Sequence, residues 1–211
     1  MNPNCTTGIC VFTMYGDNYS GIASVTVPNM EKYCKRHGYD FKVLLLDGDG
    51  NDYAYKKHEY IKELFKRDID IVWYLDCDAM VTNHKIRLED FLDEDYSVFL
   101  TRDFTELNGG SIIIRNNELG RWFNDYILSR RGHYQNEQNV INANEFSFKH
   151  FMKHLPHPSI NSYRYDLYLE CASHVGKPEL GDWKPGNFVL HVPGLGVERR
   201  KEILSQAKIT E

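Results

Sequence analysis

Residues 69–78 read Ile-Asp-Ile-Val-Trp-Tyr-Leu-Asp-Cys-Asp, a mostly apolar run that ends in two aspartates. Such a run is typical of a buried parallel strand, and ligands bind outside the carboxyl ends of these strands in open α/β sheets. Because strand side chains alternate between faces, Asp76 and Asp78 point the same way. Two neighbouring carboxylates repel each other unless a cation lies between them, and a divalent cation would also bridge them to a diphosphate. The alternative is a pair of strand-end carboxylates that cap the next helix.

A second candidate metal ligand is His191, which follows the apolar residues 188–190. Two carboxylates and one imidazole suit manganese better than magnesium, which prefers oxygen ligands and water. Gly194 and Gly196 would let backbone N–H groups approach a phosphate. The alternatives are a structural histidine and an ordinary glycine loop.

Strands and helices alternate on both sides of the aspartates, which predicts right-handed βαβ units. We expect strands at 8–13, 40–46, 69–75, 96–101, 111–115 and 188–190, and helices at 24–37, 55–67, 119–129, 137–151 and 198–208. Residues 14–18 and 108–110 have the composition of turns, and Gly38 is placed to end the first helix. The expected fold class is α/β: a single Rossmann-like domain of 211 residues with a central, mostly parallel mixed sheet flanked by helices.

The composition excludes several classes of protein. The net charge of -5 argues against binding to a nucleic-acid backbone. The N-terminus lacks the basic and apolar segments of a signal peptide, and the apolar runs are far shorter than the ~20 residues that span a bilayer. The chain has five cysteines, an odd number, and none of them forms a Cys-x-x-Cys pair. This pattern does not resemble a disulfide framework and indicates a reducing compartment. We therefore expect a soluble, cytoplasmic protein.

Other interpretations of the acidic motifs are possible. Residues 47–52 alternate acidic residues as a calcium loop does, but Asp52 and His58 stand where an EF-hand needs Gly and Glu, so a solvated turn is expected. A haloacid-dehalogenase-like phosphatase also places Asp-x-Asp after a strand, yet it has Thr or Val where Met80 stands. A non-catalytic carbohydrate-binding domain is the remaining alternative. The presence of all three candidate metal ligands, Asp76, Asp78 and His191, argues against it.

Several short motifs follow one another in a specific order along the chain. They lie at 33–40, 73–79, 107–116, 137–138, 160–163 and 181–191. In this order they resemble the retaining glycosyltransferases that include fungal galactosyl- and mannosyltransferases and plant xyloglucan xylosyltransferases. The chain is also similar to large-DNA-virus glycosyltransferases, of the chlorella virus type, that act on a major capsid protein glycan.

The resemblance implies a GT-A type fold whose first half, about residues 1–100, binds a UDP-sugar and whose second half faces a glycan or glycoprotein acceptor. It implies transfer of a hexose or deoxyhexose with retention of anomeric configuration. The implied site residues are Asp76, Asp78 and His191 for the metal; Thr13, Tyr15, Asp17, Lys56, Lys57, Asp76, Cys77, Asn108, Gly109, Gly110, His191 and Gly194 for the nucleotide sugar; and Glu137, Gln138 and Asp78 for catalysis.

The resemblance also implies a role for each group. Tyr15 would stack on uracil, Lys56 or Lys57 would reach the phosphates, and Mn²⁺, with Mg²⁺ as the alternative, would stabilise the departing UDP. Glu137 or Gln138 would stabilise positive charge at the anomeric carbon or act as a nucleophile. The residues alone leave open a surface position for Tyr15, a solvated helix face for the lysines and an exposed acid at Glu137.

The chain also departs from the family pattern. The N-terminal membrane anchor of Golgi members is not found, and Leu195 stands where the family has a cysteine. The phosphate-binding lysine of the family has no clear equivalent, although residues 199–201 are all basic. Asp103 and Asp166 are further acids that could approach the site. We also expect that the chain could be the first domain of a longer protein.

Overall fold

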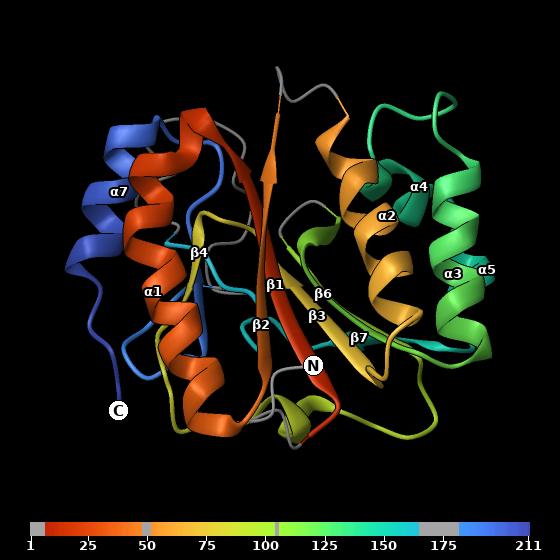
Figure 1. Cartoon of the computed structure of the whole chain (residues 1–211), viewed down its shortest axis with the longest axis horizontal. Helices are drawn as coiled ribbons and strands as arrows, with labels where there is room; N and C mark the ends of the chain where they lie inside the picture. The colour runs from red at the N-terminus through yellow and green to blue at the C-terminus, as the bar shows by residue number, and fades with distance from the viewer. Residues whose placement is uncertain (1–6, 48–51, 104–105, 165–181) are drawn as a thin grey trace.

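The computed structural model describes residues 7–47, 52–103, 106–164 and 182–211 of the chain. A central sheet separates two groups of helices (Figure 1). Its strand order is β2-β1-β3-β6-β5-β7. The strands are β1 (Ile9–Gly16), β2 (Asp40–Leu46), β3 (Ile71–Leu75), β5 (Val98–Arg102), β6 (Leu107–Arg115) and β7 (Met152–Leu155). β1 pairs in parallel with β2 and β3, β5 pairs in parallel with β7, and β6 runs antiparallel to β3 and β5.

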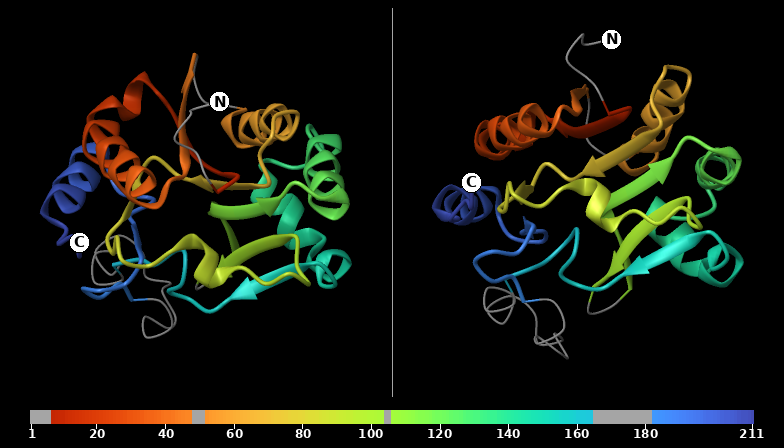
Figure 2. Two further views of the ribbon diagram at one scale, coloured as in Figure 1. Left: turned by 60° about the horizontal axis from the view of Figure 1, so that its bottom comes forward. Right: turned by 90° about the horizontal axis from the view of Figure 1, so that it is seen from below.

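Helices cover both faces of the sheet, as the three views agree (Figures 1 and 2). One side carries α1 (Ser20–His37) and α7 (Val197–Gln206), and the other carries α2 (Tyr53–Phe65), α3 (Glu118–Ser129), α4 (Glu137–Ala143) and α5 (Glu145–Phe148). Successive strand residues enter different cores: Val11 packs in the cluster that holds Tyr33 of α1, and Phe12 in the cluster that holds Ile61 of α2. Within the described residues, no helix combines the length and the apolar character needed to cross a bilayer.

The order of strands fixes where a ligand can bind. The chain leaves β1 through α1 to reach β2 on one side, and returns through α2 to reach β3 on the other side of β1. Strand order therefore reverses at β1, and a crevice opens outside the carboxyl ends of β1 and β3, where open α/β sheets bind ligands. Because β6 runs antiparallel to β3, the beginning of β6 meets the end of β3 at the same edge.

A second, small sheet forms beside this edge. It pairs β4 (Ala79–Val81) with β8 (Val189–His191) in antiparallel register, so that Ala79 lies opposite His191. Two short 3-10 turns, η1 (Asp17–Tyr19) and η2 (Leu88–Phe91), complete the described elements. The small sheet brings the C-terminal part of the chain against the residues that directly follow β3.

The predicted α/β class and mixed sheet are confirmed, and Gly38 does end α1 in the left-handed conformation, at φ 73°. The expected turn at 108–110 is wrong, because these residues lie inside β6. Their glycines accommodate close neighbours rather than a reversal of the chain. The expected helix at 137–151 is also wrong in its extent: it is interrupted at Asn144, where φ is -118°, and β7 follows α5.

One glycine of α3 tests how closely the layers pack. A Cβ atom added at Gly120 would lie 1.9 Å from the carbonyl oxygen of Arg115 at the end of β6. Replacing a helical glycine by alanine usually stabilises a helix by about 1 kcal/mol, but overpacking costs about 1–3 kcal/mol. We expect Gly120→Ala to lower the free energy of unfolding, measured by urea denaturation. Gly21→Ala in α1 is the control, since its Cβ would meet Lys201 Cδ at 3.8 Å, and it should not destabilise. Equal unfolding midpoints for the two variants would contradict this account.

Candidate active site

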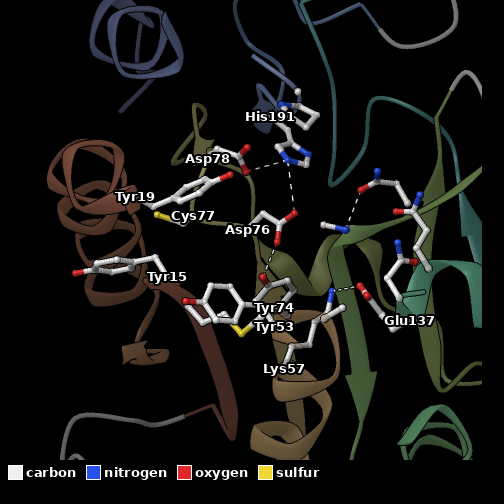
Figure 3. A pocket seen from close by; sticks show the side chains of 18 of the residues that line it. Tyr15, Tyr19, Tyr53, Lys57, Tyr74, Asp76, Cys77, Asp78, Glu137 and His191 are labelled. Carbon is white, nitrogen blue, oxygen red and sulfur yellow. Dashed lines mark hydrogen bonds and ion pairs between the residues drawn. The ribbon is translucent and has the colours of Figure 1, made fainter. Parts of the chain in front are cut away.

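A cavity of about 570 Å³ lies at the carboxyl ends of β1 and β3. Its lining comes from β1, α2, β6, α4 and β8 as well as from the residues that follow β3 (Figure 3). The elements that meet here are far apart in sequence, and the sheet topology alone brings them together. The cavity therefore occupies the position at which this class of fold binds ligands.

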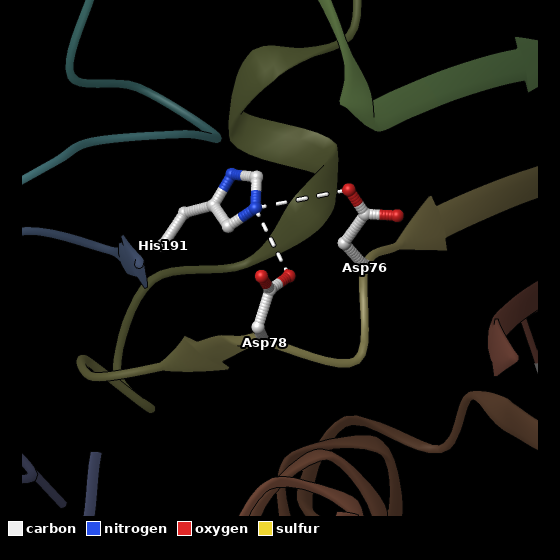
Figure 4. A group of neighbouring side chains, drawn as sticks. All are labelled: Asp76, Asp78 and His191. Atoms are coloured by element: carbon white, nitrogen blue, oxygen red, sulfur yellow. Dashed lines mark hydrogen bonds and ion pairs between the residues drawn. The ribbon is translucent and has the colours of Figure 1, made fainter. Parts of the chain in front are cut away.

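Three side chains at the end of β3 form a cluster that fits a metal ion. Ligand atoms of Asp76, Asp78 and His191 all lie within 4.8 Å of one another (Figure 4). The His191 Nε2 atom lies 3.1 Å from Asp78 Oδ1 and 3.7 Å from Asp76 Oδ2. His191 reaches this position because β8 pairs with β4 and the Val192 N–H donates to the Asp78 carbonyl at 3.1 Å. Two carboxylates and an imidazole are a donor set that a divalent cation accepts.

The charges of this cluster favour a positive group at its centre. Burial raises the pKa of Asp76, and the Lys57 ammonium offsets only part of that effect because Asp78 is also near. Burial acts in the same direction on Asp78, but His191 and Arg200 bring the pKa of this carboxyl below its ordinary value. Burial lowers the pKa of His191, yet the two aspartates outweigh it and the net shift is upward. A cation that binds here would replace the proton that the imidazole attracts.

Asp78 is also held from behind by helix α7. Arg200 Nη1 donates to Asp78 Oδ2 at 2.8 Å and to the Tyr19 hydroxyl at 2.9 Å. The Asp78 side chain is only 9% exposed, whereas that of Asp76 is 35% exposed. Asp78 is therefore fixed on one oxygen by Arg200, while Asp76 opens toward the cavity and receives a hydrogen bond from Tyr74 at 2.5 Å.

A buried ion pair forms the opposite wall. Lys57 of α2 pairs with Glu137 of α4, and their side chains are 3% and 7% exposed. The Lys57 ammonium also donates to the Gly109 carbonyl at 2.8 Å and lies 4.4 Å from the centroid of the Tyr74 ring. Gln138 Oε1 accepts the Gly109 N–H at 3.0 Å. Both backbone polar groups of this β6 residue are thus held by side chains from α2 and α4, which fixes the edge of the sheet against α4.

Gly110 lets the two walls approach each other. A Cβ atom at this position would lie 2.5 Å from Asp76 Oδ2 and 2.6 Å from His191 Cε1. The Asp76 N–H donates to the Gly110 carbonyl at 2.7 Å, so β6 continues the ladder beside the metal-ligand cluster. Glycine inside a strand marks such a close approach. A side chain here would displace two of the three candidate ligands.

The structure gathers most of the predicted site residues in one place. Those that line the cavity are Tyr15, Lys57, Asp76, Cys77, Asp78, Asn108, Gly110, Glu137, Gln138, His191 and Gly194. Gly109 lies directly behind this wall. Thr13 is buried in β1, and Asp17 and Lys56 are exposed; none of these three lines the cavity. Of the two lysines that the sequence left open, Lys57 is the one that faces the site, and it lies on a buried helix face.

Other lining residues were not predicted as part of the site. Tyr19 and Tyr53 line the cavity near Tyr15, and Asn136 lies beside Glu137. The aromatic richness of the chain is a weak signal for such tyrosines. Asp103 lines the cavity, whereas Asp166, the other spare acid, lies outside the described residues.

The sequence is similar to known proteins over most of its length. Residues 30–140 match the family described as "Protein of unknown function, DUF273". An α-1,2-galactosyltransferase of Schizosaccharomyces pombe is 25% identical to this chain. The match covers 68% of this chain and 51% of that protein. The chain thus spans about half the length of this relative. The similarity confirms the resemblance to fungal galactosyltransferases that the motifs indicated.

Solved structures share the fold. A glycosyltransferase involved in the glycosylation of the major capsid of PBCV-1 has a TM-score of 0.75 at 16% identity, over 93% of this chain and 98% of that one. The galactosyltransferase LgtC, solved with donor and acceptor sugar analogues, has a TM-score of 0.52 at 14% identity, over 96% and 97% of the two chains. These likenesses confirm the predicted GT-A fold.

The buried pair of Lys57 and Glu137 yields a stability prediction. Removing one partner leaves the other charge buried without a counterion, which costs about 3–5 kcal/mol. We expect Lys57→Met and Glu137→Leu each to lower the free energy of unfolding by this order, and the double variant to lose less than the sum. Urea denaturation of the four proteins gives the coupling free energy.

The exposed pair of Lys62 and Asp125, 2.7 Å apart, provides the control. Its side chains are 52% and 56% exposed, so Lys62→Gln should change the free energy of unfolding by less than about 1 kcal/mol. Purely additive losses at Lys57 and Glu137 would show that the two charges do not depend on each other.

Proposed function

We propose that this chain, which belongs to the family described as "Protein of unknown function, DUF273", is a metal-dependent glycosyltransferase. It would transfer a hexose or deoxyhexose from a UDP-sugar to a glycan or glycoprotein acceptor, with retention of anomeric configuration. The observation that carries the proposal is the cluster of Asp76, Asp78 and His191 on the wall of the cavity at the ends of β1 and β3. The GT-A fold supports this assignment.

The three clustered side chains would hold the metal. The chemistry that a bound divalent cation supplies is neutralisation of negative charge on the departing diphosphate. Asp76 is the ligand most open to the cavity, and Asp78 offers the oxygen that faces His191 while Arg200 holds the other. An imidazole ligand favours Mn²⁺ over Mg²⁺.

The nucleoside would lie at the end of β1. Tyr15, Tyr19 and Tyr53 line this end of the cavity, and an aromatic ring provides a face on which a base stacks (Figure 3). Gly16 lies so close to Tyr53 that a Cβ atom would come within 2.5 Å of its hydroxyl oxygen. These side chains give the uracil end an aromatic wall that the sequence indicated only at Tyr15.

The sugar would lie between the metal cluster and α4. Glu137 places a carboxylate on this wall, where it can stabilise positive charge at the anomeric carbon. Gln138 is engaged with Gly109 and with Glu106, which suits a residue that fixes the wall. In a front-face reaction the bond from the anomeric carbon to the leaving phosphate breaks as the acceptor oxygen bonds to the same face. The acceptor proton passes to the leaving phosphate oxygen.

The relatives support the same reaction class. The Schizosaccharomyces pombe protein is named as an α-1,2-galactosyltransferase, and LgtC binds both a donor and an acceptor sugar analogue. The PBCV-1 protein acts in the glycosylation of a major capsid protein, which makes a glycoprotein glycan a reasonable acceptor class for this chain. Transfer of a glycosyl group is the activity common to these comparisons.

Calorimetric titration with UDP, with and without Mn²⁺, tests the proposal. We expect binding that requires the metal, and we expect Asp78→Asn to weaken it at least 100-fold because one ligand charge is lost. Asp76→Asn should have a smaller effect, since this side chain is partly solvated. Asp125→Asn, on the exposed face of α3, is the control and should bind as the wild type does. Metal-independent UDP binding, or full affinity in both site variants, would refute the assignment.

A further inference from the structure

Two buried asparagines stand behind the metal cluster. Asn161 is fully buried and its Oδ1 lies 3.0 Å from His191 Nδ1. Its Nδ2 lies 2.9 Å from Asn108 Oδ1, and that same oxygen accepts the Gly110 N–H at 2.8 Å. The other end of the Asn108 amide, Nδ2, lies 3.2 Å from Asp103 Oδ2. These contacts form a continuous chain from the β6 backbone to the ring of His191.

The Gly110 N–H sets the direction of every hydrogen bond in this series. A backbone N–H can only donate, so the Asn108 atom that faces the Gly110 N–H must be the oxygen. The Asn161 atom that faces the Asn108 oxygen must then be the nitrogen, and the oxygen of Asn161 faces His191. An amide oxygen can only accept, so Nδ1 of His191 carries a hydrogen. The carboxylate of Asp103, which accepts from the nitrogen of Asn108, enforces the same orientation.

We infer that Asn161, oriented by Asn108, is the positioning residue that keeps a hydrogen of His191 on Nδ1, so that Nε2, which faces the Asp78 carboxylate at 3.1 Å, is the nitrogen that a cation beside Asp76 and Asp78 would occupy. The identity of the cation in this inference rests on the proposed function. The position of the hydrogen on His191 does not. Metal-binding histidines commonly donate their second N–H to a fixed acceptor, which sets the ring orientation. Here that acceptor is a neutral amide whose own orientation is set by a strand.

The backbone around Asn161 prevents the side chain from moving away. The His191 N–H donates to the Ser162 carbonyl at 2.8 Å, and the Ser162 hydroxyl donates to the Val189 carbonyl. Residues 160–163 therefore run beside β8, and Ile160, Asn161 and Ser162 are all buried. Asn161 is thus part of the same segment that holds the histidine in place. The oxygen of Asn108 accepts hydrogen bonds from Gly110 and Asn161, so only the nitrogen of this amide is left to contact a sugar.

The test combines NMR of the histidine ring with metal titration. Long-range ¹H–¹⁵N spectra of the full chain at pH 9, with the His191 signals assigned by their loss in His191→Gln, report which nitrogen is protonated. Mn²⁺ alone, titrated by calorimetry, reports affinity. We expect the wild type to carry a hydrogen on Nδ1. Asn161→Leu, which removes the acceptor at similar size, should lose that preference and bind Mn²⁺ about 10–100-fold more weakly. Asn161→Asp keeps an acceptor for Nδ1 and should retain the hydrogen there, although its second oxygen loses the hydrogen bond to Asn108.

A second buried pair in this chain supplies the matched control. Asn124 Oδ1 faces His58 Nδ1 at 2.7 Å, and both residues are buried and do not line the cavity. Asn124→Leu therefore removes the same kind of contact and should leave the His191 spectrum and the Mn²⁺ affinity unchanged.

Three results would overturn the inference: no hydrogen on Nδ1 in the wild type, an unchanged occupancy of Nδ1 in Asn161→Leu, or equal losses of Mn²⁺ affinity in Asn161→Leu and Asn124→Leu. The wild-type spectrum decides the matter even if Asn161→Leu does not fold. A wild type with its hydrogen on Nδ1 that binds no Mn²⁺ would support the role of Asn161 and refute the metal-dependent function.

Discussion

The pairing of β4 with β8 is the constraint on which the site depends. It sets Ala79 opposite His191 and lets Val192 donate to the Asp78 carbonyl, so that one short ladder carries a histidine across 113 residues of sequence to an aspartate. Without this ladder the end of β3 would hold two carboxylates with no third donor. The segment after β8 leads into α7, whose Arg200 donates to Asp78. The small sheet therefore determines both what can bind at Asp76 and Asp78 and how those side chains are held.

Charge in the site is balanced pair by pair, and the balance is unequal. Glu137 faces Lys57, and Asp78 faces both His191 and Arg200. Asp76 has a tyrosine hydroxyl, the Lys57 ammonium and a more distant imidazole near it, and it is the most exposed of these carboxylates. Bringing charges out of water is costly unless partners compensate, and the more buried Asp78 accordingly has two basic partners. The more exposed Asp76 is the carboxylate that opens toward the cavity.

The sequence predicted what local patterns control. The apolar run before Asp76 is long enough to identify β3, and the two-residue period places both aspartates on one side. Gly38 was identified as a helix end because its role is local. The glycines of 108–110 were misassigned to a turn, because their real neighbours, Asp76 and His191, come from other segments and no local pattern records such contacts. The same limit applies to Arg200 and Asn161, whose partners lie 122 and 30 residues away. His191 was selected because it follows an apolar run and because of resemblance, and only the β4–β8 register explains its position.

The two halves of the chain meet in one continuous set of contacts at the start of β6. The peptide of Gly109 is held by Lys57 and Gln138, and the next residue, Gly110, orients Asn108 and leaves room for Asp76 and His191. A shift of β6 would therefore loosen α4, rotate the amide of Asn108 and crowd the metal ligands at once. Side chains that share partners in this way do not act additively. The wall formed by Lys57 and Glu137 is thus coupled mechanically to the cluster of Asp76, Asp78 and His191, and the backbone of two adjacent glycines is the part that couples them.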